Sequence, residues 1–166
     1  MLQVFDIRED SLVTKAITSS EVETVRISSD KKIEVSVVVK NTGSQNLYGH
    51  FYLDIFYADA LSDPYDEPAD TYVTWLHESE AHDSRYIYYS TLEAGASKTW
   101  DGESPVDAST WSEGTKIDAG IVLRWSDPSG RKLYYLDVLK IADAIEIVAP
   151  AQRFAVEISD VEFSEA

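Results

Sequence analysis

The sequence has no cysteine among its 166 residues. This absence excludes disulfide bonds, thiolate metal sites and a cysteine nucleophile, and it leaves the redox compartment open. Long apolar runs are also missing, because no stretch approaches the roughly 18 residues that span a membrane. The first ten residues, MLQVFDIRED, lack the basic-then-apolar order of a secretory signal. We therefore expect a soluble chain with no membrane insertion and no visible signal peptide, whereas earlier removal of a signal stays open.

Basic residues are scarce. The 14 Lys and Arg stand against 30 Asp and Glu, which gives a formal net charge of −16. Nucleic-acid binding requires a basic footprint that neutralises phosphates, so we expect no nucleic-acid partner. Residues 41–84 contain no Lys or Arg but nine carboxylates. This charge favours solubility and is compatible with cation binding or with a medium of high salt.

No segment has the periodicity of a long amphipathic helix, whereas alternation of apolar and polar residues recurs along the chain. Short alternating runs between Asp, Pro, Gly and Ser clusters are typical of an antiparallel sandwich. We predict a single all-β domain over residues 1–166, an antiparallel β-sandwich of the immunoglobulin-like or jelly-roll kind. The strands are expected at Leu2–Ile7, Val22–Ser28, Ile33–Lys40, Leu47–Tyr57, Thr71–Leu76, Arg85–Leu92, Ile117–Trp125, Leu133–Leu139, Ala144–Val148 and Phe154–Phe163.

The clearest pattern lies in the segment from Lys32 to Ala58. Its first half places four branched apolar residues on one face, Ile33, Val35, Val37 and Val39. The sequence Asn-Thr-Gly-Ser from Asn41 reverses a chain at little steric cost. The second half then directs Leu47, Phe51, Leu53, Ile55 and Tyr57 inward. We predict a hairpin here, and a second one at the turn 126–130.

Two connections are long for a small sandwich, Asp59–Asp70 and Trp100–Thr115, and both are rich in Asp, Glu, Ser and Pro. Loops of this length are either functional segments or disordered ones. The first contains four aspartates whose oxygens suit Ca²⁺ in number and type, namely Asp59, Asp63, Asp66 and Asp70. Their spacing does not match an EF-hand, and a merely solvated acidic loop is the alternative. No cofactor is required by the sequence, with calcium as the one candidate.

The motif from Val35 to Gly43, VSVVVKNTG, and the later LEAGASKT from Leu92 resemble CARDB-type and related immunoglobulin-like β-sandwich domains. The resemblance extends over Lys32–Ala58 and Leu92–Thr99, which together cover about a fifth of the chain. The resemblance implies a sandwich fold and a role in adhesion or spacing on a cell surface, and it transfers no catalytic residue. The chain departs from the pattern in its acidic insertion and in the additional strand material at its C-terminus.

Aromatic side chains form the remaining signal. The outward face of the second half of the 32–58 segment holds Tyr48, Tyr52 and Phe56, and the acidic 100–115 loop holds Trp100 and Trp111. Exposed aromatic residues of this kind form contact surfaces for sugar rings or for protein partners. Alternatively, the long loops or a further sheet cover this face.

No Gly-x-Ser-x-Gly elbow or other catalytic motif is present, so we predict a non-enzymatic structural or interaction protein. Strand-like sequences at both ends, Leu2–Ile7 and Val156–Val161, suggest that a terminal strand adds to the sheet of a neighbour. The partners are then other protein subunits or copies of the chain itself, in a larger assembly such as a virion or a cell surface. The alternative is a carbohydrate-binding module that uses calcium to order its acidic loop.

Overall fold

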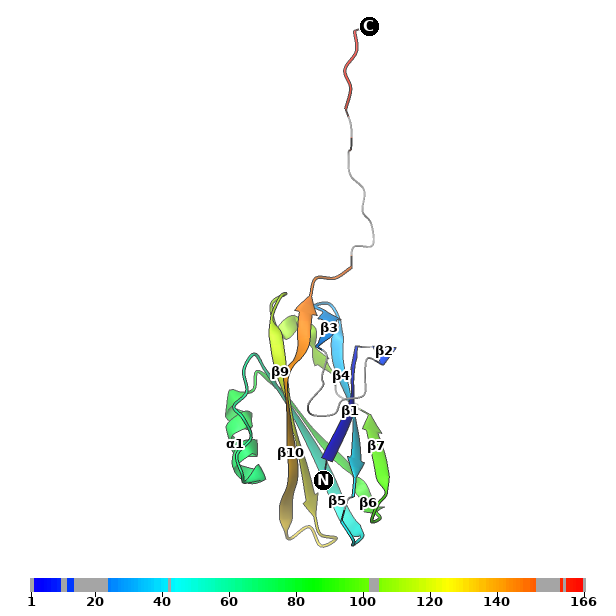
Figure 1. Ribbon diagram of the computed structural model, residues 1–166, viewed down its shortest axis with the longest axis vertical. Helices are drawn as coiled ribbons and strands as arrows, with labels where there is room; N and C mark the ends of the chain where they lie inside the picture. Colours follow the sequence, from blue (N-terminus) through cyan, green and yellow to red (C-terminus); the bar gives the residue numbers. More distant parts are fainter. Residues whose placement is uncertain are drawn as a thin grey trace.

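Two β-sheets pack face to face in the computed structural model, which describes residues 2–9, 12–13, 24–41, 43–101, 105–151, 159 and 161–165 (Figure 1). Sheet A has the order β2-β1-β4-β7, and β8 also pairs with β4. Its strands are β1 Leu2–Glu9, β2 Leu12–Val13, β4 Lys32–Lys40, β7 Ser97–Asp101 and β8 Val106–Asp107. The predicted all-β sandwich is confirmed.

Sheet B has the order β3-β10-β9-β5-β6. Its strands are β3 Val25–Ser28, β5 Leu47–Ala58, β6 Ala81–Leu92, β9 Lys116–Ser126 and β10 Leu133–Val148. Neighbouring strands are antiparallel in both sheets, except that β3 runs parallel to β10. A 3-10 turn, η1 Ala108–Thr110, and one α-helix, α1 Pro68–Glu78, complete the described elements.

The core lies between the two sheets, where the alternating apolar residues of each strand meet. Ile33, Val35, Val37 and Val39 of β4 are buried, as their alternation predicts. Across from them, Phe51, Leu53, Ile55 and Tyr57 of β5 are buried as well, and the odd-numbered residues Ile117 to Leu123 of β9 extend the same layer. Leu47 is only partly buried at the edge of this cluster.

The predicted hairpin between β4 and β5 is wrong, although both strands exist. β4 pairs with β1 and β7, whereas β5 pairs with β6 and β9, so the connection crosses from one sheet to the other. Both strands have an apolar face, and facing each other across the core buries both faces at once. Asn41 fixes the crossing, because its side chain accepts from Gly43 N at 3.0 Å and donates to Leu92 O at 3.0 Å.

The predicted hairpin at 126–130 is confirmed, since β9 and β10 pair antiparallel from Ser126 and Leu133 onward. Within the turn, the Ser129 hydroxyl donates to Asp127 Oδ1 at 2.7 Å, and this hydrogen bond lowers the pKa of the Asp127 carboxyl. The two strands predicted at Leu133–Leu139 and Ala144–Val148 form one strand, β10. A register shift between Ile141 and Ile145, with Asp143 at φ 48°, explains why the alternation breaks there.

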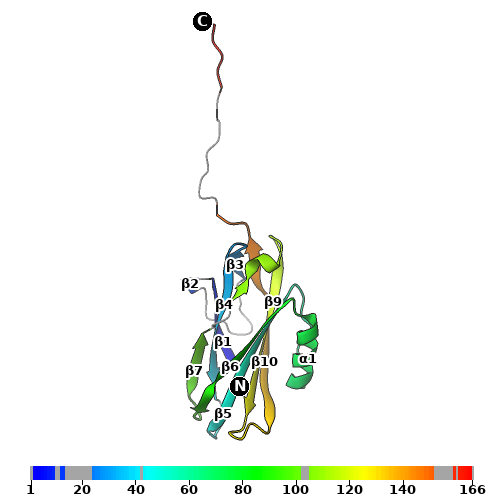
Figure 2. The same ribbon diagram turned by 180° about the vertical axis from the view of Figure 1, so that it is seen from behind.

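The strand predicted at Thr71–Leu76 is a helix, α1, which lies against the outer face of sheet B (Figure 2). Thr71 and Trp75 are one helical turn apart, and both are buried. Trp75 packs with Phe56, Ala58, Leu61 and Val122 in a second core outside the sandwich, and its Nε1 donates to Ser62 O at 2.9 Å. Gly120 leaves space for the Trp75 ring, because a Cβ at position 120 would lie only 2.6 Å from that ring. The predicted 59–70 loop therefore ends inside α1.

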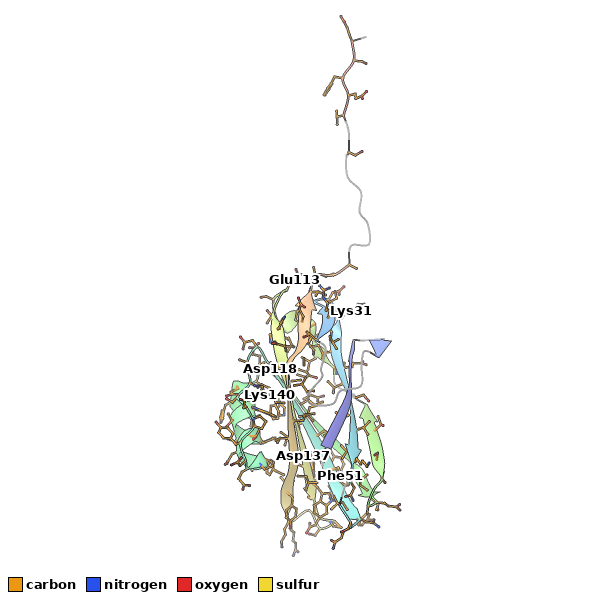
Figure 3. All side chains as sticks on the ribbon, in the orientation of Figure 1. Lys31, Phe51, Glu113, Asp118, Asp137 and Lys140 are labelled. Carbon is orange, nitrogen blue, oxygen red and sulfur yellow. The ribbon has the colours of Figure 1, made fainter. Side chains whose placement is uncertain are left out.

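Polar contacts hold the segment before α1 onto sheet B, and Figure 3 labels two of the side chains that form them, Asp118 and Lys140. Asp118 Oδ2 accepts from Leu61 N at 2.9 Å, and its Oδ1 accepts from Asp143 N at 2.8 Å. Lys140 Nζ donates to Leu61 O at 2.6 Å and to Asp63 Oδ1 at 3.1 Å. Asp118 is buried and Asp63 is exposed, so we expect Asp118 to contribute more to the stability of the fold than Asp63.

We expect Asp118→Ala to lower the free energy of unfolding by about 1–3 kcal/mol, because two backbone N–H groups lose their acceptor in a buried place. Asp63→Ala is the matched control and should cost less than about 1 kcal/mol, because it removes a solvent-exposed ion pair. Urea denaturation of both variants measures the difference. Equal losses would show that Asp118 does not hold this segment.

The strand predicted at Leu2–Ile7 is confirmed, since β1 covers Leu2–Glu9. β1 pairs antiparallel with β4 of its own chain, from Leu2 opposite Val39 to Glu9 opposite Ile33. Much of the strand predicted at Phe154–Phe163 lies outside the described residues, and Val161 and Phe163, which are described, are exposed and not part of a strand. No helix among the described residues is long and apolar enough to cross a membrane.

Candidate functional site

The outer face of sheet B bears a cluster of aromatic and charged side chains beside α1. We call this cluster the tyrosine face and define it as Tyr48, His50, Tyr52, Tyr72, Tyr86, Arg124 and Tyr135. On β5, period-2 alternation directs residues 48, 50 and 52 to the face opposite the core. Tyr86 comes from β6, Arg124 from β9, Tyr135 from β10 and Tyr72 from α1. Figure 1 shows the ends of β5, β9 and β10 extending beyond the helix.

Tyr86 is the most exposed member of the tyrosine face, at 57%, and Tyr48 is 46% exposed. Tyr86 lies opposite Tyr52 in the β5–β6 pair, and their ring centroids are 5.3 Å apart. The Tyr86 hydroxyl and His50 Nδ1 lie 2.7 Å apart, within hydrogen-bonding distance. The rings of Tyr52, Tyr86 and His50 are therefore held against one another rather than scattered.

A buried ion pair lies below these rings. Asp54 is fully buried on the outer face of β5, and it accepts from Arg124 Nε at 2.6 Å and from Arg124 Nη2 at 3.2 Å. His82 Nε2 lies 3.2 Å from Asp54 Oδ1, and the His82 ring stacks on Phe56 at 4.4 Å. The two-point contact of a guanidinium with a carboxylate fixes the plane of the Arg124 side chain.

Arg124 lies between two tyrosine rings, with its guanidinium carbon 5.1 Å from the Tyr52 centroid and 5.0 Å from that of Tyr72. Burial acts to lower the pKa of Arg124, but the hydrogen bond and charge of Asp54 outweigh it, so the pKa lies above its usual value. Burial raises the pKa of Tyr72, with a further contribution from the charge of Asp54. Arg124 is thus a permanent cation and Tyr72 a neutral phenol at physiological pH.

The structure places the predicted contact aromatics in different surroundings. Tyr48 and Tyr52 belong to the tyrosine face. Phe56 does not, because α1 covers it and its ring packs against Tyr72 and Trp75. Trp111 is also buried, where it meets Tyr57 of the sandwich core at 6.3 Å. The predictions that Phe56 and Trp111 form a contact surface are therefore wrong, and the side chain of Trp100 lies outside what the structure describes.

The four aspartates predicted to bind calcium do not converge. Asp59, Asp66 and Asp70 are exposed, and Asp70 lies in the first turn of α1, where a carboxylate stabilises the helix dipole. Asp63 pairs with Lys140. In the part of the chain that the structure describes, no three His, Asp or Glu side chains lie close enough to hold one metal ion.

Arg124 and Tyr72 are among the members of the tyrosine face that the sequence analysis does not single out. Arg124 is the one basic residue between Lys116 and Arg131, and it directly follows the apolar run Ile121–Leu123. Asp54 is likewise a charged residue in a mostly apolar strand, β5. Charged residues are rarely buried unless they are paired, so the occurrence of Arg124 and Asp54 in two such strands indicates an ion pair. The sequence gives no signal for Tyr72, because the residues around it, TYVTWL, favour a strand over the helix that positions it.

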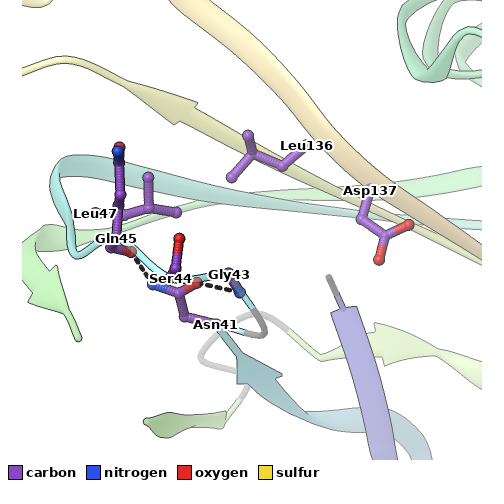
Figure 4. Close-up of a pocket in the computed structure, with 7 residues that line it drawn as sticks. All are labelled: Asn41, Gly43, Ser44, Gln45, Leu47, Leu136 and Asp137. Atoms are coloured by element: carbon purple, nitrogen blue, oxygen red, sulfur yellow. Dashed lines mark hydrogen bonds between the residues drawn. The ribbon is translucent and has the colours of Figure 1, made fainter. Parts of the chain in front are cut away.

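An open pocket of about 590 Å³ lies elsewhere, at the end of the sandwich where β4 crosses to β5 (Figure 4). Polar groups of the crossing line one side, and Leu136 and Asp137 of β10 line the other. The side chain of Asn41 forms hydrogen bonds with Gly43, Gln45 and Leu92, so its role is to stabilise the crossing and not to bind a ligand. We therefore place the candidate site at the tyrosine face.

No family model matches the sequence, and no curated protein matches it. Among solved structures, the C-terminal domain of wzt aligns with 99% of this chain and 84% of its own chain, at 8% identity and a TM-score of 0.47. A likeness of this degree supplies no argument about ligand or activity. The resemblance to CARDB-type domains stays a prediction.

Proposed function

We propose that the chain is a non-catalytic binding module that contacts carbohydrate through the tyrosine face. The observation that supports this proposal is the exposure of Tyr48 and Tyr86 beside the fixed group of Tyr52, His50 and Arg124. Tyrosine combines a flat apolar ring with a polar hydroxyl, which suits the apolar face and the hydroxyl rim of a sugar ring. The absence of any nucleophile motif from the sequence agrees with binding without chemistry.

Rigidity of the site favours binding, because ordered side chains lose less entropy when a ligand arrives. Asp54 fixes Arg124 at two points, and Arg124 in turn lies against Tyr52 and Tyr72. The face is therefore supported from below by a buried ion pair. This arrangement is what a preorganised binding surface requires.

Tyr86→Ala is expected to weaken polysaccharide binding at least about tenfold, which corresponds to about 1.4 kcal/mol. Tyr86 is largely exposed, so its loss should leave the fold intact. Retardation in gels that contain different polysaccharides, followed by a glycan array, measures the effect. The control is Tyr65→Ala, which removes a tyrosine of similar exposure, 52%, from the segment before α1. Failure of the unaltered chain to bind any glycan, or an equal loss in both variants, would contradict the proposal.

A second candidate function is that of a subunit in a larger assembly. Two observations favour it: the long strand β6 is the last strand of sheet B among the described residues, and Val161 and Phe163 near the C-terminus are exposed at 63% and 96%. Exposed sheet edges and exposed apolar side chains both promote association between chains. The partners are then other protein subunits or copies of this chain.

A further inference from the structure

We infer that the tyrosine face selects uncharged glycans over glycans that carry carboxylate or sulfate groups. This inference rests on the proposed function and specifies the class of its ligand. Three features of the molecule support it: the order of side chains across sheet B, the pairing of Arg124 with Asp54, and the acidity of the surrounding chain.

Four side chains of the tyrosine face form a row across sheet B. Tyr86 of β6 is opposite Tyr52 of β5, which is in turn opposite Arg124 of β9. Tyr135 of β10 continues the row, since it is opposite Arg124. Tyr86 is 57% exposed, whereas the side chain of Arg124 is only 14% exposed. A ligand on this row therefore meets mainly the tyrosine side chains and little of the guanidinium.

The charge of Arg124 is neutralised within the protein. Asp54 is fully buried, and it accepts from Arg124 Nε at 2.6 Å and from Arg124 Nη2 at 3.2 Å. The rings of Tyr52 and Tyr72 lie against the same guanidinium, with their centroids 5.1 and 5.0 Å from its carbon. Full pairing with an anionic ligand would separate Arg124 from a buried carboxylate, which is strongly unfavourable. Arg124 therefore supports the tyrosine face but does not provide it with a charge for a ligand.

The chain around the tyrosine face is acidic. Four members of the face belong to residues 41–84, a stretch that contains nine carboxylates and no Lys or Arg. The whole chain has a net charge of −16, and repulsion between like charges extends over about 10 Å at 0.1 M ionic strength. A carboxylate or sulfate on the ligand is therefore repelled, whereas the hydroxyl groups of an uncharged sugar can form hydrogen bonds with the tyrosines.

A glycan array with matched pairs tests the inference at about pH 8, where histidine side chains are ordinarily uncharged. Each pair comprises one oligosaccharide with and without a carboxylate or sulfate group. Where a pair binds, the uncharged member should bind at least tenfold more tightly. Equal or tighter binding of the charged members would overturn this inference and leave the proposed function in place. Binding to no glycan would overturn the proposed function and, with it, this inference.

The dependence on salt gives a second readout. Raising NaCl from about 50 to about 500 mM should change the affinity for the uncharged glycans less than twofold, because no ion pair with the ligand is screened. A tenfold loss of affinity over this range would overturn the inference, since it would indicate attraction between charges.

Asp54→Asn removes the negative charge beneath Arg124 with almost no change in volume. It should narrow the ratio of the two affinities, uncharged to charged, at least threefold, because the charge of Arg124 is no longer neutralised. Thermal denaturation first establishes that the variant is folded. An unchanged ratio in the folded variant would overturn the inference that Asp54 prevents Arg124 from attracting anions.

A variant that leaves the ion pair intact is Ser84→Lys. Ser84 is exposed on β6, opposite Asp54 and two positions from Tyr86, so the new lysine adds a cation beside the face. The ratio should again narrow at least threefold, whereas Ser84→Gln, which adds a long polar side chain without charge, should leave it within twofold. An equal effect of both substitutions would overturn the discrimination by charge.

Three cations adjacent to the face in sequence serve as controls. Arg131 and Lys132 are exposed in the turn before β10, and the side chain of Arg85, next to Tyr86, lies outside what the structure describes. Replacement of each by Gln should leave the ratio within twofold. A ratio that widens at least tenfold would show that one of these cations attracts charged glycans to the site, which would overturn the inference.

Discussion

Trp75→Ala is expected to lower the free energy of unfolding by about 3–5 kcal/mol, the range for a large buried aromatic residue. Trp75 is fully buried, and it joins α1 to Phe56 and Val122 on the outer face of sheet B. Its Nε1 also holds the preceding segment through Ser62 O. Without the ring, α1 loses its principal contact and Phe56 becomes exposed. Denaturation in guanidinium chloride, followed by circular dichroism, measures the loss.

The control on the same helix is Leu76→Ala, which removes an exposed side chain and should change stability by less than about 0.5 kcal/mol. Gly120→Ala tests the contact from the other side, because the new Cβ would lie 2.6 Å from the Trp75 ring. It should destabilise the native chain by about 1–3 kcal/mol. In the Trp75→Ala background it should be nearly neutral. Additive losses would show that ring and glycine do not act together.

Asp54→Ala is expected to cost a similar amount, about 3–5 kcal/mol, because it leaves Arg124 partly buried without its counter-ion. The double variant Asp54→Leu with Arg124→Leu should cost less than either single variant, Asp54→Leu or Arg124→Leu. Thermal and chemical denaturation of the three variants completes a double-mutant cycle. A double variant as unstable as the sum of the single ones would show that the ion pair contributes nothing as a pair.

The alternation of apolar residues predicted the strands well because one face of β3, β4, β5, β9 and β10 is buried in the same core. It did not predict which sheet each strand joins. β4 and β5 have the same pattern whether they pair side by side or face each other across the core, so the hairpin between them was an error of pairing. The turn at 126–130 gave the correct pairing because its short loop leaves β9 and β10 no other choice.

The helix α1 was missed because its sequence, TYVTWL from Thr71, consists largely of residues that favour strands. Its helical form depends on tertiary packing of Trp75 over Gly120, which local propensity does not reveal. Because the helix was missed, the predicted contact surface was also partly wrong. Tyr48 and Tyr52 were predicted correctly to face outward, whereas Phe56, two positions beyond Asp54 on the same face, lies beneath the missed helix.

The pairing of β3 with β10 also determines when the chain can fold. Val25 and Ile145 are opposite each other although 120 positions separate them. Contacts between positions so distant in sequence form slowly, since a long loop must close before the pairing stabilises it. During synthesis, β9 and β5 would emerge with one edge of the sheet still unfilled until β10 follows. Protection from aggregation is therefore needed most in the interval before residue 148 leaves the ribosome.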